Sequence, residues 1–263
     1  MKSILKFATA AAIGAMMTAG TAYADVKLGV AAEPYPPFAE KGASGTWTGW
    51  EIEIGDALCA AMNEKCVWVE VAWDGIIPAL TSKKIDAIIS SMSITEERKK
   101  TISFSDKYYN TPAVIVAPKG SKIDGTPESV KGKIVGVQVS TTHANYTEKH
   151  IGPSASSVKT YQTFDEHNQD LVAGRVDAVI GDSIAMEPFL KSAEGACCEV
   201  KGQLSDDAIF GPGAGAGLRS ATGPVVRPVR PELRRRHLDD GPLARRGRGL
   251  AAAAGDTGRD ASS

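Results

Sequence analysis

The chain has 263 residues, of which 43% are hydrophobic and 23% charged, so it is long enough for one large or two modest domains and is not a disordered tail. Its formal net charge of -1 is the sum of unlike parts: 20 basic and 26 acidic residues precede Arg219, and 10 basic and 5 acidic residues follow from Arg219 onward. This distribution argues against reading the whole chain as a nucleic-acid binder.

The first 24 residues are typical of a secretory signal peptide. Lys2 and Lys6 give a positive start, an apolar run rich in Ala and Met follows, and Ala22-Tyr23-Ala24 supplies a small-x-small cleavage pattern. A transmembrane anchor is the alternative, but glycines and threonines interrupt the apolar run. We therefore expect cleavage after Ala24 and a mature protein outside the inner membrane.

Short β-rich runs then alternate with helical patterns. The first half is predicted to hold strands at residues 26–30, 67–71 and 85–89 and helices at 50–62 and 74–82. The second half is predicted to hold strands at 114–117, 134–139, 158–161 and 176–180, and helices from about 141, through Leu171, and at 184–190. Such alternation predicts an α/β fold with mainly parallel sheets.

Two segments within this alternation match each other. Residues 84–89 and 175–180 agree in character at every position, and extending the match forward pairs Ser91 with Asp182. The match predicts two similar α/β lobes. Because ligands bind at the carboxyl ends of parallel strands, Ser91 and Asp182 are expected to face a cleft between the lobes.

The four cysteines lie in two close pairs. Cys59 and Cys66 stand at the end of a predicted helix and the start of a predicted strand, and export to an oxidising compartment favours a disulfide between them. Cys197 and Cys198 are adjacent, so free thiols and a vicinal bridge both remain open. Neither the cysteines nor the histidines have metal-ligand spacing. We expect no metal and no cofactor.

Hydroxyl groups and an arginine follow the first matched strand. Ser90, Ser91 and Ser93 lie at the strand end, Thr95 is placed to cap a helix, and Arg98 lies one turn into that helix. A guanidinium beside such a turn is a good receptor for a carboxylate because its planar fork matches both oxygens. The alternative is a solvated charged helix.

A second strand-to-helix junction carries Ser140, Thr141 and Thr142. Backbone N–H groups at such a junction, together with the helix dipole, can hold an anionic group, although the same residues can be a simple helix cap. Asp182, at the end of the second matched strand, is placed to bind an ammonium group.

Aromatic and acidic residues follow two other predicted strands. Glu33 and Tyr35 lie in a proline-rich loop, and Trp73 opens another loop. A carboxylate between aromatic faces suits a ligand with a positive end and an aliphatic stem, although the aromatic residues can equally pack in the core. The segments 181–185 and 211–217 fail the nucleophile-elbow and dinucleotide-binding patterns, so neither supports an enzyme.

Taken together, these motifs closely resemble the periplasmic amino-acid-binding proteins of ABC importers, solute-binding protein family 3. The chain looks most like the branch that binds lysine, arginine, ornithine and histidine, and its opine-binding relatives. The resemblance covers about residues 26–219 and rests on segments 29–38, 49–53, 72–80, 90–98, 104–106, 136–141 and 174–178. Cys59 and Cys66 also match the disulfide of that branch.

The resemblance implies a two-lobed type II periplasmic-binding-protein fold with a mainly parallel sheet in each lobe. Lobe 1 would span residues 25–112, lobe 2 residues 113–204, and residues 205–219 would return to lobe 1. The implied protein is a periplasmic monomer that binds a polar or basic L-amino acid or opine by lobe closure and delivers it to an inner-membrane permease. It would not be an enzyme and would bind no nucleic acid. A dehydratase or a sensor on the same fold is the alternative.

The resemblance also implies roles for the candidate residues. Arg98 would hold the ligand carboxylate with Thr141 and Ser93, and Asp182 with Ser91 would take the α-ammonium group. Tyr35 and Trp73 would sandwich the ligand side chain, and Glu33 with Glu51 would face its distal charge.

Two positions depart from the branch. Thr142 stands where the branch often has Gln, and Glu33 lies one residue nearer to Tyr35 than its acidic residue does. These departures leave the exact side-chain preference open.

The family pattern stops at Arg219. Residues 220–263 are rich in Arg, Ala, Gly and Pro and contain no aromatic residue, whereas the family continues with an amphipathic helix and a terminal aromatic segment. We interpret this tail as the product of a frameshift in a GC-rich gene, which would make a non-functional product one outcome. A natural basic tail for an anionic surface and a sequencing error are the alternatives.

Overall fold

The computed structural model describes residues 25–205, 207–211 and 213–220. The chain divides into two units, Met1–Ser220 and Ala221–Ser263, and every described residue belongs to the first. The predicted signal peptide and the interpretation of residues 221–263 lie outside the described residues. Within the described ranges, no helix is long and apolar enough to cross a membrane.

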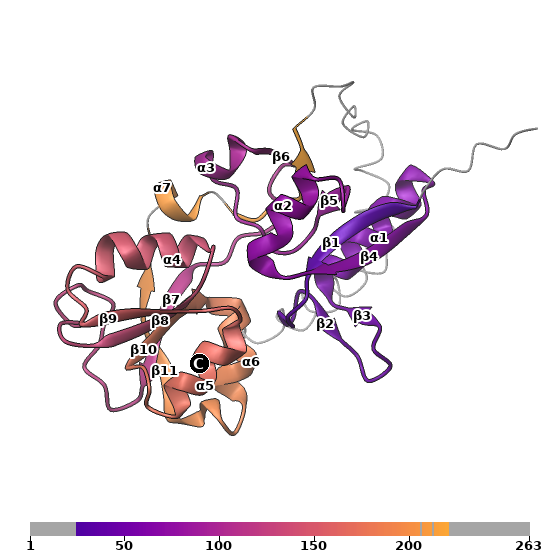
Figure 1. Cartoon of the computed structure of the whole chain (residues 1–263). Coiled ribbons are helices and arrows are strands. Elements are labelled where there is room, and N and C mark those ends of the chain that lie inside the picture. The colour runs from indigo at the N-terminus through magenta and orange to yellow at the C-terminus, as the bar shows by residue number, and fades with distance from the viewer. Residues whose placement is uncertain (1–24, 206, 212, 221–263) are drawn as a thin grey trace, which may run out of the picture. The chain divides into compact units, whose positions relative to one another are not determined.

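The first sheet has five strands in the order β4-β1-β5-β12-β6 (Figure 1). They are β1 (Val26–Ala31), β4 (Cys66–Val71), β5 (Ala87–Ile88), β6 (Ile102–Phe104) and β12 (Gly217–Arg219). β1 pairs in parallel with β4 and β5, and β12 pairs antiparallel with β5 and β6. We call the part of the chain built around this sheet lobe 1.

Helices cover both faces of the lobe 1 sheet. They are α1 (Trp50–Met62), the 3-10 turn Trp73–Gly75, α2 (Ile76–Thr81) and the short α3 (Glu96–Lys99), with a hairpin of β2 (Glu40–Lys41) and β3 (Trp47–Thr48) alongside. On one face Ile76 and Leu80 of α2 pack against Ile88 of β5, and all three are buried. On the other face Gly55 lets α1 approach closely, because a Cβ there would lie 2.4 Å from the Trp68 ring.

The second sheet also has five strands, in the order β11-β7-β10-β8-β9. They are β7 (Ala113–Pro118), β8 (Ile134–Gln138), β9 (Ser157–Tyr161), β10 (Ala178–Asp182) and β11 (Cys198–Leu204). β8 pairs in parallel with β9 and β10, and β7 pairs antiparallel with β10 and β11. We call the part built around this sheet lobe 2.

Two hydrophobic cores flank the lobe 2 sheet. The helical segments are α4 (Thr142–Tyr146), a π-helical turn Thr147–Ile151, α5 (Phe164–Val172), α6 (Ser183–Lys191), a 3-10 turn Gly195–Cys197 and α7 (Asp207–Phe210). Ile151 packs with β8 on one face, whereas Leu171 and Met186 pack with Val179 on the other. Thr163 and Glu166 form a capping box that fixes the start of α5.

The two sheets repeat one topology. Read as β4-β1-β5-β12-β6 and β9-β8-β10-β7-β11, both have two parallel pairs followed by two antiparallel pairs. β5 and β10, which overlap the matched segments of the sequence, occupy the same central place. The structure thus has the two similar lobes that the internal match predicts.

The prediction of mainly parallel sheets is confirmed: in each sheet four of the five strands run in the same direction, and one strand, β12 in lobe 1 and β7 in lobe 2, runs the opposite way. Alternation of strands and helices reveals only pairs joined by a helical crossover, and antiparallel neighbours need no such connection. β6, β11 and β12 pair only with antiparallel neighbours, and these three strands are absent from the predicted elements. β5 is also shorter than the predicted strand at 85–89.

Both cysteine pairs are bonded. Cys59 and Cys66 join the end of α1 to the start of β4, as predicted, with Asn63 ending the helix in the left-handed conformation. Cys197 and Cys198 form a vicinal disulfide, which resolves the alternative that the sequence left open.

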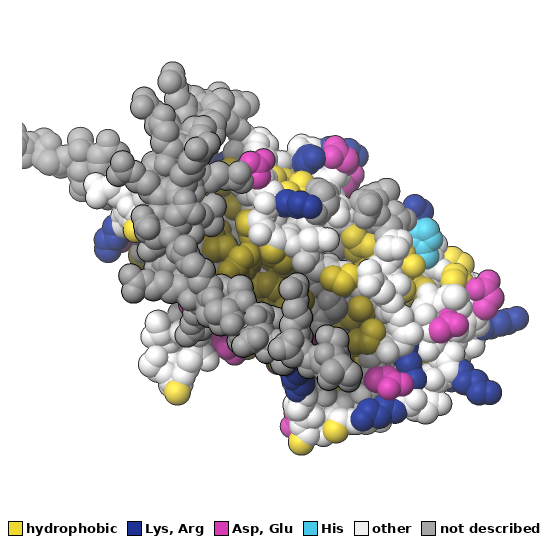
Figure 2. Space-filling model, turned by 180° about the vertical axis from the view of Figure 1, so that it is seen from behind, with side chains coloured by type: hydrophobic (Ala, Val, Ile, Leu, Met, Phe, Trp, Pro, Cys, Tyr) yellow, Lys and Arg dark blue, Asp and Glu magenta, His cyan; other side chains and the backbone are white. Residues whose placement is uncertain are grey.

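The surface of the described residues mixes charge signs. Figure 2 shows the face opposite to that of Figure 1, where Lys and Arg side chains alternate with Asp and Glu and hydrophobic side chains gather near the middle. Exposed large hydrophobic residues include Leu58 and Met62 of α1 and Leu218 of β12.

Removing the bond between Cys59 and Cys66 should destabilise lobe 1. Its cysteines are seven residues apart, and loop-closure entropy predicts a loss of about 2–3 kcal/mol in the free energy of unfolding for the double variant Cys59→Ala with Cys66→Ala. Urea unfolding measures this loss. In a reducing buffer the difference from the unaltered chain should shrink, because both then lack the bond; an unchanged difference would assign the effect to packing instead.

Candidate functional site

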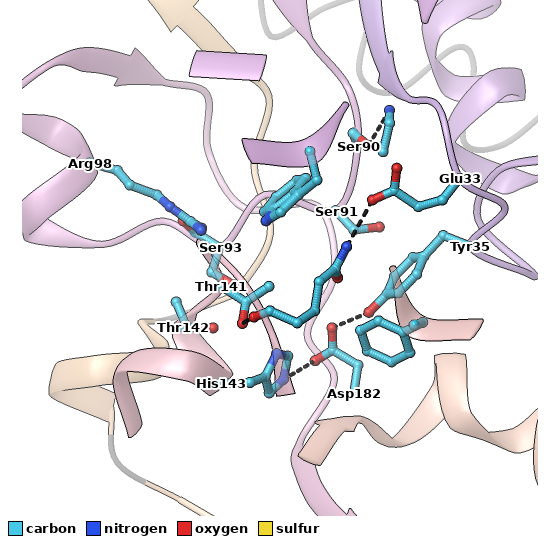
Figure 3. Close-up of a pocket in the computed structure, with 14 residues that line it drawn as sticks. Glu33, Tyr35, Ser90, Ser91, Ser93, Arg98, Thr141, Thr142, His143 and Asp182 are labelled. Atoms are coloured by element: carbon cyan, nitrogen blue, oxygen red, sulfur yellow. Dashed lines mark hydrogen bonds and ion pairs between the residues drawn. The ribbon is translucent and has the colours of Figure 1, made fainter. Parts of the chain in front are cut away.

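A pocket with about 450 Å³ of empty space lies where strand ends of the two lobes face each other (Figure 3). Lobe 1 contributes the loop after β1, the turn after β4 and the segment after β5. Lobe 2 contributes the junction of β8 with α4, the start of α5 and the end of β10. The lining residues are Ala31, Glu33, Tyr35, Trp73, Ser90, Ser91, Ser93, Arg98, Gln138, Thr141, Thr142, His143, Phe164 and Asp182.

Arg98 supplies the positive charge of the pocket. Thr95 caps α3 by accepting a hydrogen bond from the Arg98 backbone N–H at 3.1 Å, as the sequence predicts. The guanidinium donates to the carbonyl oxygens of Ser93, at 3.0 Å, and Ser140, at 3.1 Å, and lies 5.5 Å from the centre of the Trp73 ring. Burial lowers the pKa of Arg98 to about 10, so the group stays charged at neutral pH.

The junction of β8 and α4 is held by local backbone geometry. Ser140 adopts φ of 60°, a left-handed conformation that turns the chain, and its carbonyl also accepts a hydrogen bond from Trp73 Nε1 at 3.2 Å. The Thr141 hydroxyl donates to the Gln138 carbonyl at 2.7 Å and accepts from the Ala144 N–H at 3.0 Å, which caps α4. Bonds from Arg98 and Trp73 to Ser140 thus link the two lobes.

Asp182 supplies a negative charge from lobe 2. Its Oδ2 accepts a hydrogen bond from the Tyr35 hydroxyl of lobe 1, and its Oδ1 lies 3.4 Å from His143 Nε2 (Figure 3). Burial, and then the charge of Asp182, raise the pKa of Tyr35 well above its usual value, so the phenol remains a donor. The Tyr35 ring packs edge-on against Phe164, with centroids 5.2 Å apart.

A second carboxylate, that of Glu33, lines the same pocket. Gln138 Nε2 donates to Glu33 Oε1 at 2.8 Å and to the Gln162 carbonyl at 2.9 Å, which again connects the lobes. Burial raises the pKa of Glu33, against the lowering effect of its hydrogen bonds. A nearby cation would therefore stabilise the ionised carboxylate of Glu33.

The serines after β5 are fixed by buried acceptors and donors. Ser90 Oγ accepts a hydrogen bond from the Ala31 N–H at 2.9 Å. Ser91 has φ of 52°, and its N–H and hydroxyl both donate to the Glu51 carboxylate, at 2.7 and 2.8 Å. Tyr108 donates to the same carboxylate at 2.5 Å.

Glu51 therefore does not face the pocket. It is 1% exposed, lies on α1 behind the serine turn, and holds Ser91 in place. Because its carboxylate already accepts three hydrogen bonds and does not line the pocket, we no longer assign Glu51 to the distal charge of a ligand. Ser140 likewise contributes its carbonyl to Arg98 and Trp73 and is not a lining residue.

The structure brings together ten of the twelve predicted site residues. Four lining residues were not predicted: Ala31, Gln138, His143 and Phe164. Gln138 gave a readable signal, because it is a polar residue at the end of an otherwise apolar strand pattern. His143 and Phe164 gave none, since each is a single residue in the first turn of a helix. No group of three or more His, Cys, Asp or Glu among the described residues is placed to hold a metal ion.

The arrangement can bind a zwitterion. A guanidinium from lobe 1 and a carboxylate from lobe 2 line the same pocket, together with hydroxyl groups and aromatic rings. A second carboxylate, Glu33, adds negative charge to the same pocket. This pattern suits an α-amino acid that carries an additional positive group.

Comparisons with known proteins agree with this geometry. Residues 26–131 match the family described as bacterial extracellular solute-binding proteins, family 3. The chain is 44% identical over 196 residues to the L-arginine-binding protein of Pseudomonas aeruginosa, covering 74% of this chain and 75% of that protein. It is 40% identical over 205 residues to the histidine-binding periplasmic protein of Salmonella typhimurium, covering 77% and 79%. A structure of an ancestral arginine-binding protein bound to arginine has a TM-score of 0.69 at 34% identity, covering 75% of this chain and 85% of that one.

Glu51 should be needed for the serine turn although it lies outside the pocket. The variant Glu51→Ala leaves the buried donors of Ser91 and Tyr108 without an acceptor, so it should lower the free energy of unfolding by about 1–3 kcal/mol in urea. Tyr108→Phe removes one donor and leaves the other two paired, so its loss should be smaller. Equal losses in the two variants would contradict the assigned role of Glu51.

Proposed function

Because the chain belongs to the bacterial extracellular solute-binding proteins of family 3, we propose that it is the periplasmic substrate-binding component of an ABC amino-acid importer and that it binds a basic L-amino acid or a related opine. The observation that carries the proposal is the opposition of Arg98 and Asp182, from different lobes, across one pocket. The names of the relatives, which refer to L-arginine and histidine, support the ligand class.

The ligand carboxylate binds Arg98. The guanidinium is already oriented by its bond to the Ser93 carbonyl, and Ser93 and Thr141 stand beside it in the pocket. The planar fork can meet both carboxylate oxygens, and each charge-assisted hydrogen bond contributes about 1.5–3 kcal/mol. Thr142, at the start of α4, adds a hydroxyl and a helix N-terminus on the same side.

The ligand ammonium binds Asp182. Tyr35 donates to one carboxylate oxygen and so orients the group, while Ser91, from the equivalent strand end of lobe 1, offers a hydroxyl on the opposite side. Ser90 supports this turn through its bond to the backbone of β1. The ammonium thus receives oxygen atoms from both lobes.

The ligand side chain extends between Tyr35 and Trp73 toward Glu33. The aromatic faces suit an aliphatic stem, and the Glu33 carboxylate, with Gln138 beside it, suits a terminal cation. The ligand cation would replace part of the hydration that Glu33 loses on burial. Glu51 has no part in this contact.

Contacts from both lobes couple binding to closure. A ligand that touches Arg98 and Asp182 together makes its full set of contacts only when the lobes are closed, so it stabilises that state by its differential affinity. Trp73 and Arg98 of lobe 1 donate to the Ser140 carbonyl, and Gln138 of lobe 2 donates to Glu33, so direct hydrogen bonds join the lobes beside the same pocket. The closed monomer is then the form that the permease receives, after export and cleavage behind Ala24.

We propose binding rather than turnover, because the relatives named above are binding proteins. A dehydratase on the same fold would convert a prephenate-like acid into product. Incubating the full chain with such acids and with amino acids distinguishes the two, since a binding protein gives thermal stabilisation without product.

Arg98→Ala should weaken binding of L-arginine at least about 100-fold, because about two charge-assisted hydrogen bonds are lost. Calorimetry measures the affinity, and circular dichroism checks the fold. The matched control is Arg175→Ala, which removes an exposed arginine that pairs with Asp170 in lobe 2. The control should bind as the unaltered chain does. Unaltered affinity in Arg98→Ala would exclude Arg98 as the carboxylate receptor.

A further inference from the structure

His143 is a buried polar side chain with no role in the site described so far. It lies in the first turn of α4, is 5% exposed and lines the pocket (Figure 3). Neither of its ring nitrogens has a hydrogen-bond partner among the described residues. Nε2 nevertheless lies 3.4 Å from Asp182 Oδ1, the carboxylate assigned to the ligand ammonium.

The surroundings of the ring are largely apolar. Phe164 of α5 and Phe210 of α7 lie against it, with ring centroids 6.5 and 5.7 Å away. The carboxylate beside the imidazole, that of Asp182, is the one that the ligand needs.

The titratable groups tied to His143 are Asp182 and His167, together with Tyr35, which bonds to the same carboxylate. Asp182 ends β10, Tyr35 comes from the loop after β1, and His167 lies on α5. Burial, and then the charge of His143, lower the pKa of His167 to about 3, so His167 stays neutral at the pH values where imidazoles usually titrate. Tyr35 stays a neutral phenol. The interaction that changes with pH is therefore the one between His143 and Asp182.

We propose that His143 makes ligand affinity depend on pH: in its neutral form it leaves Asp182 Oδ1 to the ligand ammonium, and in its protonated form it competes for the same oxygen. This inference rests on the proposed function. Two cations beside one buried carboxylate repel each other, so the ammonium displaces the proton of His143 into the solvent. Ligand binding then releases a proton at mildly acidic pH and none at mildly alkaline pH.

The sign of the pH effect follows directly. As the pH falls, more of the free protein carries protonated His143, and a larger share of the binding energy is used to expel that proton. Affinity therefore decreases as the pH is lowered, by at most about tenfold per pH unit for one proton. Glu33 can also take up protons because burial raises its pKa, so the two acids must be separated by variants.

The test is calorimetry of the full chain with L-arginine at about pH 5.5 and about pH 8, in buffers of different ionisation enthalpy. The unaltered chain should release a proton on binding at the lower pH and bind at least about threefold more weakly there. His143→Gln should lose less affinity at the lower pH than the unaltered chain does, and it should release fewer protons; the pH dependence that remains belongs to Glu33. His150→Gln, which removes another histidine of lobe 2, should retain the proton release that depends on His143.

Each contrary result is informative. Equal proton release by His143→Gln and the unaltered chain would overturn the inference and leave the proposed function intact. Loss of binding by a folded His143→Gln at both pH values would also overturn it, because His143 would then be a required contact. Failure of the unaltered chain to bind L-arginine, L-lysine, L-ornithine or L-histidine would instead contradict the proposed function, and the inference with it.

A second measurement avoids reliance on one variant. If His143→Gln does not fold, nuclear magnetic resonance of the His143 ring in the unaltered chain answers the same question. Adding L-arginine should lower the pH at which the ring becomes protonated. An unchanged or higher midpoint would overturn the inference.

Discussion

The site depends on placing a guanidinium and a carboxylate, from separate lobes, against one small space. Arg98 is anchored by the carbonyls of Ser93 and Ser140, and Asp182 is oriented by Tyr35. Neither charge is neutralised by a direct bond to the other, so both remain available for a zwitterion. The opposite charges of such a ligand match the site, whereas an uncharged molecule would leave both groups desolvated without compensation.

The repeated sheet topology explains how two distant residues reach the same place. β5 and β10 occupy equivalent central positions, so Ser91 and Asp182 leave their sheets at equivalent edges. The turns there are tight: Ser91 and Ser140 both adopt left-handed backbone conformations, which direct the chain across the end of the sheet. The buried packing of α2 and α5 against the sheets holds these edges in place.

Much of this architecture could be predicted from the sequence because its signals are local. Periodicity places α1 and most of the parallel strands, and Thr95 and Thr141 mark helix starts correctly. Antiparallel β12 was missed because three residues in a glycine-rich segment carry no periodicity, and its partners are far away in the chain.

Glu51 shows the limit of such reasoning for the site. An acidic residue early in a helix is normally solvated. Glu51 instead accepts hydrogen bonds from Ser91 and Tyr108, which are 40 and 57 residues away in the sequence. His143 shows the same limit in reverse, since only the fold brings it within 3.4 Å of Asp182. The roles of side chains that act through residues distant in the sequence can be assigned only from the structure, whereas residues at strand ends can be located from the sequence pattern.

The most direct test of the account is a crystal structure of the chain with the basic amino acid or opine that stabilises it most against heat. We predict that the ligand carboxylate contacts Arg98 and its ammonium contacts Asp182, with both lobes closed on it. A ligand bound in the reverse orientation, or outside the pocket between the lobes, would contradict the central claim.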